Sequence, residues 1–316
     1  MDWQSTLIRV FLFVQDRFGP QLRALAQRQS NNNPPAFTDE EVLTIYLFGL
    51  MKRWRTIRDI HTYAADHFPD WFPDLPSYGG YVSRLNRLSD VFALLSEAAI
   101  GELMTACKRG SPHTSGDVRG GVRKVMRLVD SFPIVMAGPK RSSKARVAPG
   151  IADKGYCGSK NLYFYGVKLH IVAFSRPGKL PVPDLAGLSA GSANDLTVLR
   201  DVLPVISGGD LVGDKAYLVG DKAYVNRTLR AQMIKEQNLE IVTPIKKAKG
   251  QTHLSAADRL YSQAVSRIRQ PIESLFAWIE EKTGIQAASK VRSTQGLMVH
   301  VFGRFAAAML LLAFNP

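Results

Sequence analysis

The pattern of apolar residues changes once along the chain, and this change constrains the fold more than any other feature of the sequence. Residues 1–107 carry apolar residues at helical spacing, which predicts one helix after another. Residues 108–122 (KRGSPHTSGDVRGGV) are polar, Gly-rich and without periodicity, as in a linker. From residue 123 onward, β-rich runs alternate with helical segments. We therefore predict an all-helical domain at 1–107, a linker, and an α/β domain with C-terminal helices at 123–316.

The helical region contains a helix–basic turn–helix segment at 38–66. Thr38 begins a capping-box pattern (TDEE), in which a Thr hydroxyl and a Glu three residues later satisfy the free amides of a first helical turn. The basic turn KRWR follows, and Thr56 is positioned to cap the next helix. Such a unit either reads DNA, with Arg53 and Arg55 as contacts, or is a plain bundle with a solvated basic turn.

Three acidic residues are distinguished by their positions in the pattern. Asp130 follows the apolar strand VMRLV, and a second Asp follows an apolar run within LVGDKAY. Glu273 lies on an amphipathic helix, SRIRQPIESLFAWIEEK. A carboxylate beside a buried strand must be paired, hydrogen-bonded or metal-bound. If the three converge, they predict a site for hard divalent cations, and a pair of such ions supports phosphoryl transfer. The alternative is three unrelated capping or salt-bridged acids.

The second acidic residue occurs twice, because Leu211–Tyr217 and Leu218–Tyr224 are identical copies of LVGDKAY. Either Asp214 or Asp221 can supply the carboxylate, and only one copy can occupy the active-site strand. Added length is tolerated cheaply in a surface loop, since each doubling of loop length costs only about 0.6 kcal/mol. An insertion directly after the catalytic residue would instead displace the catalytic segment. We therefore predict Asp221, with Asp214 as the alternative.

The chain carries 41 Lys and Arg against 27 Asp and Glu, a formal net charge of +14. This excess favours a polyanionic partner such as double-stranded DNA, although a merely basic protein would have the same composition. Lys140, Arg141 and Lys144 follow the Asp130 strand and are candidates to contact the phosphate backbone, or are simply solvated. Lys168 shares a strand face with His170, so this face either lines the DNA or holds a satisfied, half-buried histidine.

Several classes of protein are not indicated. Cys107 and Cys157 form no CxxC pair, and the six histidines form no zinc-binding motif. The uninterrupted apolar run Phe305–Phe314 is shorter than the roughly 20 residues of a membrane span, so we predict a buried terminal helix. No signal-peptide pattern is visible, which favours the cytoplasm. Trp278, on the Glu273 helix, is interpreted as a core residue.

Five motifs in order resemble the DDE transposases of bacterial insertion sequences. They are LVDSFPIVM, DKGYCGSKNLYFYGVKLHIV, SAGSANDLTVL, GDKAY, and the pair Arg269 and Glu273, which together cover Val125 to about Lys282. The resemblance implies a ribonuclease-H-like mixed sheet flanked by helices, and metal-dependent DNA cleavage and strand transfer. It implies that Asp130, the GDKAY aspartate and Glu273 are catalytic metal ligands for two Mg²⁺ or Mn²⁺ ions.

The same resemblance implies how the protein meets DNA. Arg269 would contact DNA phosphate, and the chain would act on the element's inverted repeats and on target DNA, as a homodimer associated with the nucleoid. Two departures are visible. Ser266 and Glu280 stand where related elements have a Tyr and a Lys, with Lys282 as a substitute for the Lys, and the GDKAY motif is doubled. Two alternatives to an active transposase stay open: another nuclease with the ribonuclease-H fold, and a decayed transposase that only binds DNA.

Overall fold

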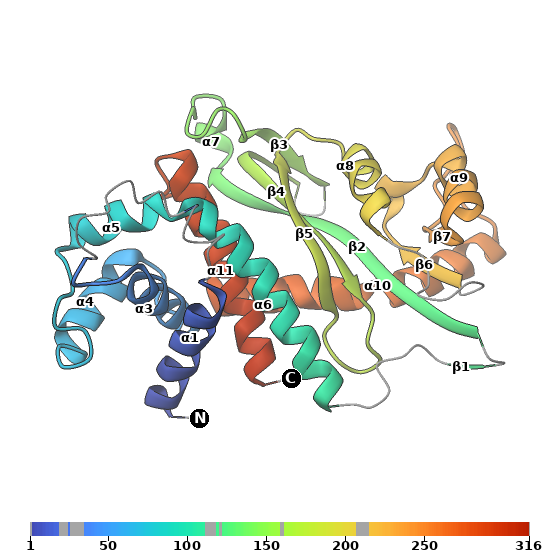
Figure 1. The fold of residues 1–316 in the computed structure, drawn as a ribbon. Coiled ribbons are helices and arrows are strands. Elements are labelled where there is room, and N and C mark those ends of the chain that lie inside the picture. Colours follow the sequence, from blue (N-terminus) through green and yellow to red (C-terminus); the bar gives the residue numbers. More distant parts are fainter. Residues whose placement is uncertain are drawn as a thin grey trace.

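The computed structural model describes residues 2–18, 25, 35–110, 118–119, 122–158, 161–206 and 215–315. Figure 1 shows a group of helices from the N-terminal part of the chain beside a twisted sheet that is flanked by further helices. The α/β class with a preceding helical region, predicted from the sequence, is confirmed.

The N-terminal helices are α1 (Trp3–Arg17), α3 (Asp39–Met51), α4 (Ile57–His67), α5 (Tyr78–Arg87) and α6 (Ser89–Gly110). Both predicted caps are present. The Thr38 hydroxyl accepts the Glu41 amide and the Glu41 carboxylate accepts the Thr38 amide, and Thr56 and Asp59 repeat the arrangement. Two boundaries differ from the prediction. Helix α1 ends at Arg17 rather than near residue 28, and α6 continues to Gly110, into the predicted linker.

The strands are β1 (Val118–Arg119), β2 (Val122–Ala137), β3 (Asp153–Cys157), β4 (Leu162–Phe174), β5 (Val182–Ala190), β6 (Lys215–Val219) and β7 (Leu239–Val242). The main order is β3-β4-β2-β6-β7, with β5 also paired to β4 and β1 paired to β2. The β2–β4, β3–β4 and β4–β5 pairs are antiparallel, whereas β6 runs parallel to β2 and β7. The long strand β2 is therefore central, with an antiparallel half of the sheet on one side and a parallel half on the other.

The remaining elements are α7 (Pro139–Ser142), α8 (Asp195–Val202), η2 (Leu203–Val205), η3 (Lys222–Tyr224), α9 (Arg227–Gln237), α10 (Ala256–Thr283) and α11 (Thr294–Phe314). The helices pack against both faces of the sheet, and each face forms a separate hydrophobic core. Leu128, Phe132 and Ile134 of β2 belong to the core that includes Ile272 and Leu275 of α10. Val129 belongs to the opposite core, beneath α8 and α9, because neighbouring residues of a strand point to opposite faces.

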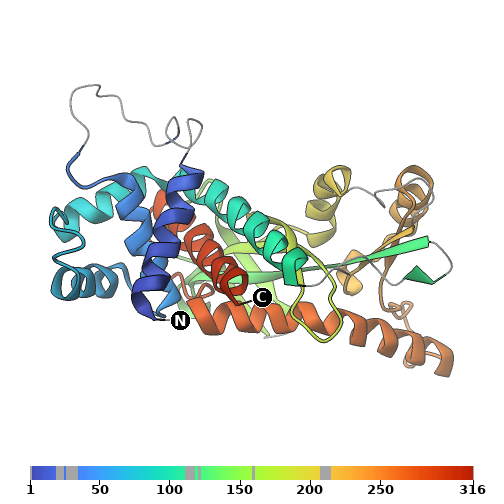
Figure 2. The same ribbon diagram turned by 60° about the horizontal axis from the view of Figure 1, so that its bottom comes forward.

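The C-terminal helix α11 packs in the helical region, although the sequence assigned it to the α/β domain. Figure 2 shows α11 beside α6 and above α10. A Cβ at Gly303 would lie 2.6 Å from the Tyr46 ring of α3, so the glycine permits this close approach of the two helices. Helix α11 has the length and mean hydropathy (1.9) of a membrane span, but 78% of its apolar window is buried inside the protein, as predicted. One core therefore joins the helical region to the end of the chain.

A buried cation and histidine join the ends of these helices. Arg304 of α11 donates to the carbonyl oxygens of Thr283 and Arg55 and to Nδ1 of His300. His300 Nε2 in turn contacts the Ile285 carbonyl oxygen at 2.9 Å. Burial and the Arg304 charge lower the pKa of His300 to about 3, so the imidazole is neutral and donates from Nε2.

The pKa of His300 predicts a pH-dependent stability. An unfolded histidine takes up its proton near pH 6.5, while the folded one does so only near pH 3. As the pH falls through this window, the free energy of unfolding of the parent protein should therefore fall by up to about 1.4 kcal/mol per pH unit relative to that of His300→Gln. The glutamine keeps a hydrogen-bond donor and an acceptor but cannot titrate. Urea unfolding of both proteins between pH 7 and 5 measures this difference. Parallel stability curves would contradict the buried neutral histidine.

Candidate active site

Asp130 lies within the central strand β2, on the face that α10 covers. It pairs in register with Ile171 of β4, and the neighbours that share its face, Leu128 and Phe132, are buried. Its side chain is only 17% exposed. One carboxylate oxygen accepts the Ser131 amide at 2.9 Å and the other accepts a guanidinium N–H of Arg269 at 2.5 Å. The sheet thus holds this carboxylate in a fixed position with its charge compensated.

Asp221 follows β6 directly and lies beside Asp130. The last β2–β6 pair is Leu128 with Val219, so each aspartate comes two residues later on a parallel neighbour. The Asp221 carboxylate accepts the Ala223 amide at 2.7 Å and caps the short helix η3. Gly220 is required here, because a Cβ would lie 2.7 Å from the ring of Tyr224. The second copy of the repeat therefore forms the turn beside Asp130.

The first copy contributes strand instead. Strand β6 takes Lys215-Ala216-Tyr217 from the first copy and Leu218-Val219 from the second, so it spans the junction rather than lying within one copy. Asp214 lies outside the described residues. Its neighbour Lys215 pairs with Lys124, six residues before Asp130, which is about 20 Å along an extended strand.

Glu273 and Arg269 approach from helix α10. They are four residues apart, so both side chains lie on one face of the helix and form an ion pair. Ile272 and Leu275 are fully buried beneath α10, and the rings of Phe276 and Phe132 lie 4.5 Å apart. This packing holds the helix against β2. Arg269 thereby contacts the carboxylates of both Asp130 and Glu273.

The electrostatics show that the three acids are neighbours. The pKa of Asp130 is raised to about 7. Burial raises it most, Arg269 and the Ser131 amide lower it, and the charges of Asp221 and Glu273 add to the increase. Burying one carboxylate near two others is costly without cations. In this structure Arg269 supplies the positive charge.

The donor set suits a hard divalent cation, because it consists of carboxylate oxygens on three rigid elements. Among the described residues, no three acidic, histidine or cysteine side chains are close enough together to hold a metal ion. The Arg269 guanidinium lies between Asp130 and Glu273. Binding a cation with all three acids therefore requires Arg269 to release at least one carboxylate.

Comparison with known families identifies the family of this chain. The family model described as the transposase DDE domain matches residues 120–293, which is more than half of the 316-residue chain. The chain belongs to the DDE transposases. This family cleaves and joins DNA and typically uses divalent metal ions, and its ribonuclease-H-like fold agrees with the mixed sheet. No curated protein and no solved structure matches the chain.

Lys168 and His170 lie on the other face of this transposase's sheet. Opposed residues of an antiparallel pair point to the same face, so His170 shares the face of Ser131, not that of Asp130. Lys168 is bound to the Ala193 carbonyl and the Asp195 carboxylate, and its side chain is 16% exposed. His170 contacts the Ser189 hydroxyl, and burial lowers its pKa to about 4. The satisfied histidine is thus the interpretation that the contacts favour, and its side chain is buried rather than half-buried.

The arginines of the predicted basic turn contact the protein itself. Arg55 donates to the carbonyl oxygens of Glu280 and Glu281 at the C-terminal end of α10, and Arg53 forms an ion pair with Glu281. These contacts match the preference of cations for helix C-termini. They give both arginines a role in joining the helical region to α10, and DNA contact by either stays a prediction.

The other predicted cations are accessible. Lys140, Arg141 and Lys144 are exposed in and after α7, at the end of β2. Asp130 is seven residues before the end of that strand, so this loop begins about 23 Å from the acidic site.

Lys282 follows Glu273 by nine residues and therefore faces the opposite side of α10. It does not join the acidic site as a substitute for the Lys of related elements.

Two residues near the site were not assigned from the sequence. Asp195, at the start of α8, accepts from both Lys168 and the Ser131 hydroxyl, and the motif SANDLTVL does not indicate these contacts. Tyr224 is buried as packing would predict, yet its hydroxyl has no hydrogen-bond partner among the described residues. Burial and the charges of Asp130, Asp195 and Asp221 raise its pKa well above 10. Only the three-dimensional structure shows that Asp195 and Tyr224 lie near the acidic site.

Removing the Arg269 charge should destabilise the protein in a pH-dependent way. At pH 8 without divalent ions, Arg269→Met removes the cation that lowers the pKa of Asp130, so this pKa should rise further above 7 and the free energy of unfolding should fall by up to about 1.4 kcal/mol, the value of the one pH unit between 7 and 8. At pH 5.5 the Asp130 carboxyl is protonated, so the cost should be smaller. Urea unfolding measures both values. The exposed Arg267→Met on the same helix is the matched control and should change stability by less than about 0.5 kcal/mol.

The double variant Asp130→Asn with Arg269→Met separates this explanation from simple loss of packing. If the unpaired carboxylate causes the instability, the double variant should recover most of the loss at pH 8. Equal losses at both pH values, without recovery in the double variant, would contradict it.

Proposed function

We propose that this chain is an active transposase that cleaves and joins DNA at the ends of an insertion sequence. The proposed catalytic residues are Asp130, Asp221 and Glu273. One observation carries the proposal. Carboxylates from β2 and from α10, far apart in sequence, meet at a single guanidinium, and the charge of the carboxylate after β6 raises the pKa of Asp130.

The proposed cofactor is a pair of Mg²⁺ or Mn²⁺ ions held by these three carboxylates. Bound there, divalent ions would activate the attacking oxygen and stabilise the leaving oxygen at phosphorus. The protein's own contribution is to fix the ligands. Strand β2 and the Ser131 amide orient Asp130, the η3 turn orients Asp221, and the buried face of α10 positions Glu273.

Arg269 is proposed to have two partners in turn. In the free protein it compensates the charge of Asp130 and Glu273. When cations take over these carboxylates, its planar guanidinium is available for a DNA phosphate, which it matches with paired N–H donors. The raised pKa of Asp130 supports this exchange, because a carboxylate that is costly to bury gains from a stronger cation.

The proposed partner is double-stranded DNA, comprising the inverted repeats of the element and its target. The net charge of +14 supports binding to a polyanion, and the exposed cations Lys140, Arg141 and Lys144 are the best placed of the predicted backbone contacts. Residues 1–107 are proposed to recognise the element's ends, in a homodimer assembled on DNA in the cytoplasm, at the nucleoid.

The repeated heptapeptide provides a test with an internal control. Asp130→Asn, Asp221→Asn and Glu273→Gln should each lower metal-dependent cleavage of end DNA by at least about 100-fold, because losing a group that merely orients a ligand already costs about 10- to 100-fold. Asp214→Asn makes the same chemical change in an identical local sequence and should leave cleavage near that of the parent. Cleavage is measured on labelled DNA with Mg²⁺ or Mn²⁺, and binding is measured in parallel.

Three results would each overturn part of this proposal. An inactive Asp214→Asn with an active Asp221→Asn would assign the site to the first copy. Cleavage without strand-transfer products would indicate another nuclease of this fold. A parent protein that binds end DNA and never cleaves it would be the decayed, DNA-binding form.

Deleting one copy of the repeat tests what the extra residues do. Removal of Leu211–Tyr217 or of Leu218–Tyr224 yields the same sequence, in which Gly208-Gly209-Asp210 takes the β6 positions of Lys215-Ala216-Tyr217. Cleavage should persist, since GDKAY still follows Leu-Val. Stability should fall by about 1–3 kcal/mol, because Gly and Asp are poor strand formers and the fully buried Ala216 is lost. A deletion protein of unchanged stability, measured by urea unfolding, would contradict the strand assignment.

A further inference from the structure

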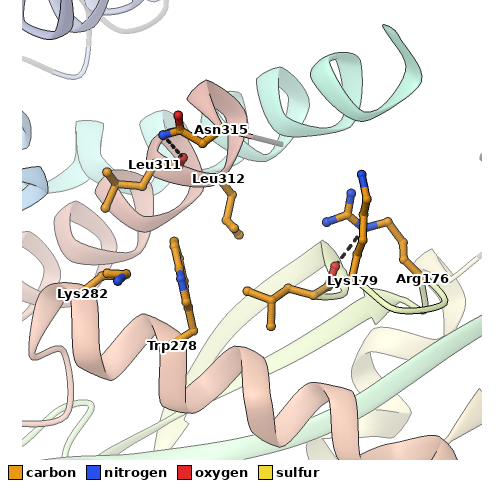
Figure 3. Close-up of a pocket in the computed structure, with 8 residues that line it drawn as sticks. Arg176, Lys179, Trp278, Lys282, Leu311, Leu312 and Asn315 are labelled. Atoms are coloured by element: carbon orange, nitrogen blue, oxygen red, sulfur yellow. Dashed lines mark hydrogen bonds between the residues drawn. The ribbon is translucent and has the colours of Figure 1, made fainter. Parts of the chain in front are cut away.

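A groove separate from the acidic site opens between α10, α11 and the turn that joins β4 to β5. Its volume is about 460 Å³, within the range of small-ligand sites. Figure 3 shows Trp278 and Lys282 rising from α10, Leu311 and Leu312 on α11, and Arg176 and Lys179 on the β4–β5 turn. Three segments distant in sequence therefore form one site.

The charged residues of the groove all have the same sign. Arg176, Lys179 and Lys282 line it, and no acidic side chain does so among the residues that the structure describes, although the Lys282 ammonium also donates to the Glu281 carboxylate at 2.9 Å. Arg176 is held in place by its bonds to the Leu180 carbonyl and the Cys107 sulfur. Lys179 is exposed, and within the described part of the chain its ammonium has no hydrogen-bond or ion-pair partner. Such a site complements phosphate groups.

The wall of the groove is aromatic and apolar. Trp278 was expected to lie in the core, but it is half-buried and lines the groove together with three leucines, Leu180, Leu311 and Leu312. The Lys282 ammonium, one helical turn later, lies 5.9 Å from the centre of the indole ring. An aromatic ring beside several cations is the combination that binds single-stranded nucleic acid, where bases stack and phosphates pair with basic groups.

We propose that this groove binds an unpaired nucleotide of DNA, with its base against Trp278 and its phosphates at Arg176, Lys179 and Lys282. The inference rests on the proposed action on DNA ends. The indole lies half-buried between α10 and α11, so a base stacked within a duplex cannot reach it, whereas a base outside the duplex can.

The groove and the acidic site share one rigid element. Trp278 follows Glu273 by five residues, which places it about 7.5 Å farther along α10 and turned by about 140° around its axis. The groove therefore lies most of the way around α10 from Glu273, so a DNA end engaged by the acidic site would pass its unpaired strand around this helix to reach it. This assigns Trp278 and Lys282 to substrate binding, not to the reaction centre.

Binding of a fluorescein-labelled 12-nucleotide oligothymidylate to the full chain, followed by fluorescence anisotropy in EDTA, tests the proposal. Trp278→Leu should weaken binding by about 10-fold or more, within the range of one lost base–aromatic stack, and Trp278→Phe should retain most of the affinity. Lys179→Gln should reduce the slope of log affinity against log salt by about 0.7, the value for one phosphate of a single strand. Lys235→Gln, an exposed cation of α9, removes the same charge elsewhere and should change neither quantity.

A blunt duplex of matched sequence supplies the second comparison, and Trp278→Leu should affect its binding much less than that of the single strand. Equal effects on both would contradict an unpaired base in the groove, and unchanged binding in both Trp278→Leu and Lys179→Gln would overturn the site. Because the assay needs no metal and no cleavage, its failure leaves the acidic site untouched. Absence of all DNA binding by the parent would instead contradict the proposed function itself.

Discussion

The contact between Arg269 and Asp130 is the interaction on which the organisation of this protein depends. A carboxylate in the middle of the central strand cannot stay charged in a folded protein without a cation, and α10 brings that cation to it. The apolar face of α10 and the ion pair thus favour the same docking of helix on sheet. Glu273 then lies beside Asp130 as a consequence of helical spacing, and Asp221 as a consequence of the β2–β6 register.

The helical region is joined to this arrangement through the far end of α10. Arg55 binds the last carbonyl groups of α10, and buried Arg304 joins Thr283 to the Arg55 carbonyl. Helix α11 lies in the same core as α3 and α6, so the chain closes on its own N-terminal region. If residues 1–107 hold a DNA end, this connection sets where that end lies relative to Glu273. The basic turn has a structural role in holding the helical region to α10.

Local chemistry made part of this structure predictable. Thr38, Thr56 and Asn194 cap helices as their sequences indicate, because such caps involve only residues three or fewer positions apart. Asp130 and Glu273 were identifiable because an acid beside a buried strand or helix face is unusual. The sequence predicts a strand before Asp221 but not where that strand begins and ends. The two copies are identical, so nothing local places β6 across their junction.

Features set by long-range packing could not be predicted. Lys168 and His170 share a strand face, but which face depends on the register with β2, and the sequence does not state that register. The apolar pattern of α11 requires burial without specifying the partner, and Gly303 is recognisable as a contact only once Tyr46 lies against it. Trp278 fits a core position by helical spacing, yet the space beside it belongs to a groove formed by two other segments.

The proposed function requires Asp130, Asp221 and Glu273 to hold divalent cations together. Iron-mediated cleavage of the polypeptide tests this most directly, because Fe²⁺ bound in place of Mg²⁺ generates radicals, in the presence of ascorbate and peroxide, that cut the nearby backbone. We expect cuts beside residues 130, 221 and 273, which excess Mg²⁺ should suppress and which Asp130→Asn should abolish. Cuts beside Asp214, or a cleavage pattern that Mg²⁺ and Asp130→Asn leave unchanged, would contradict it.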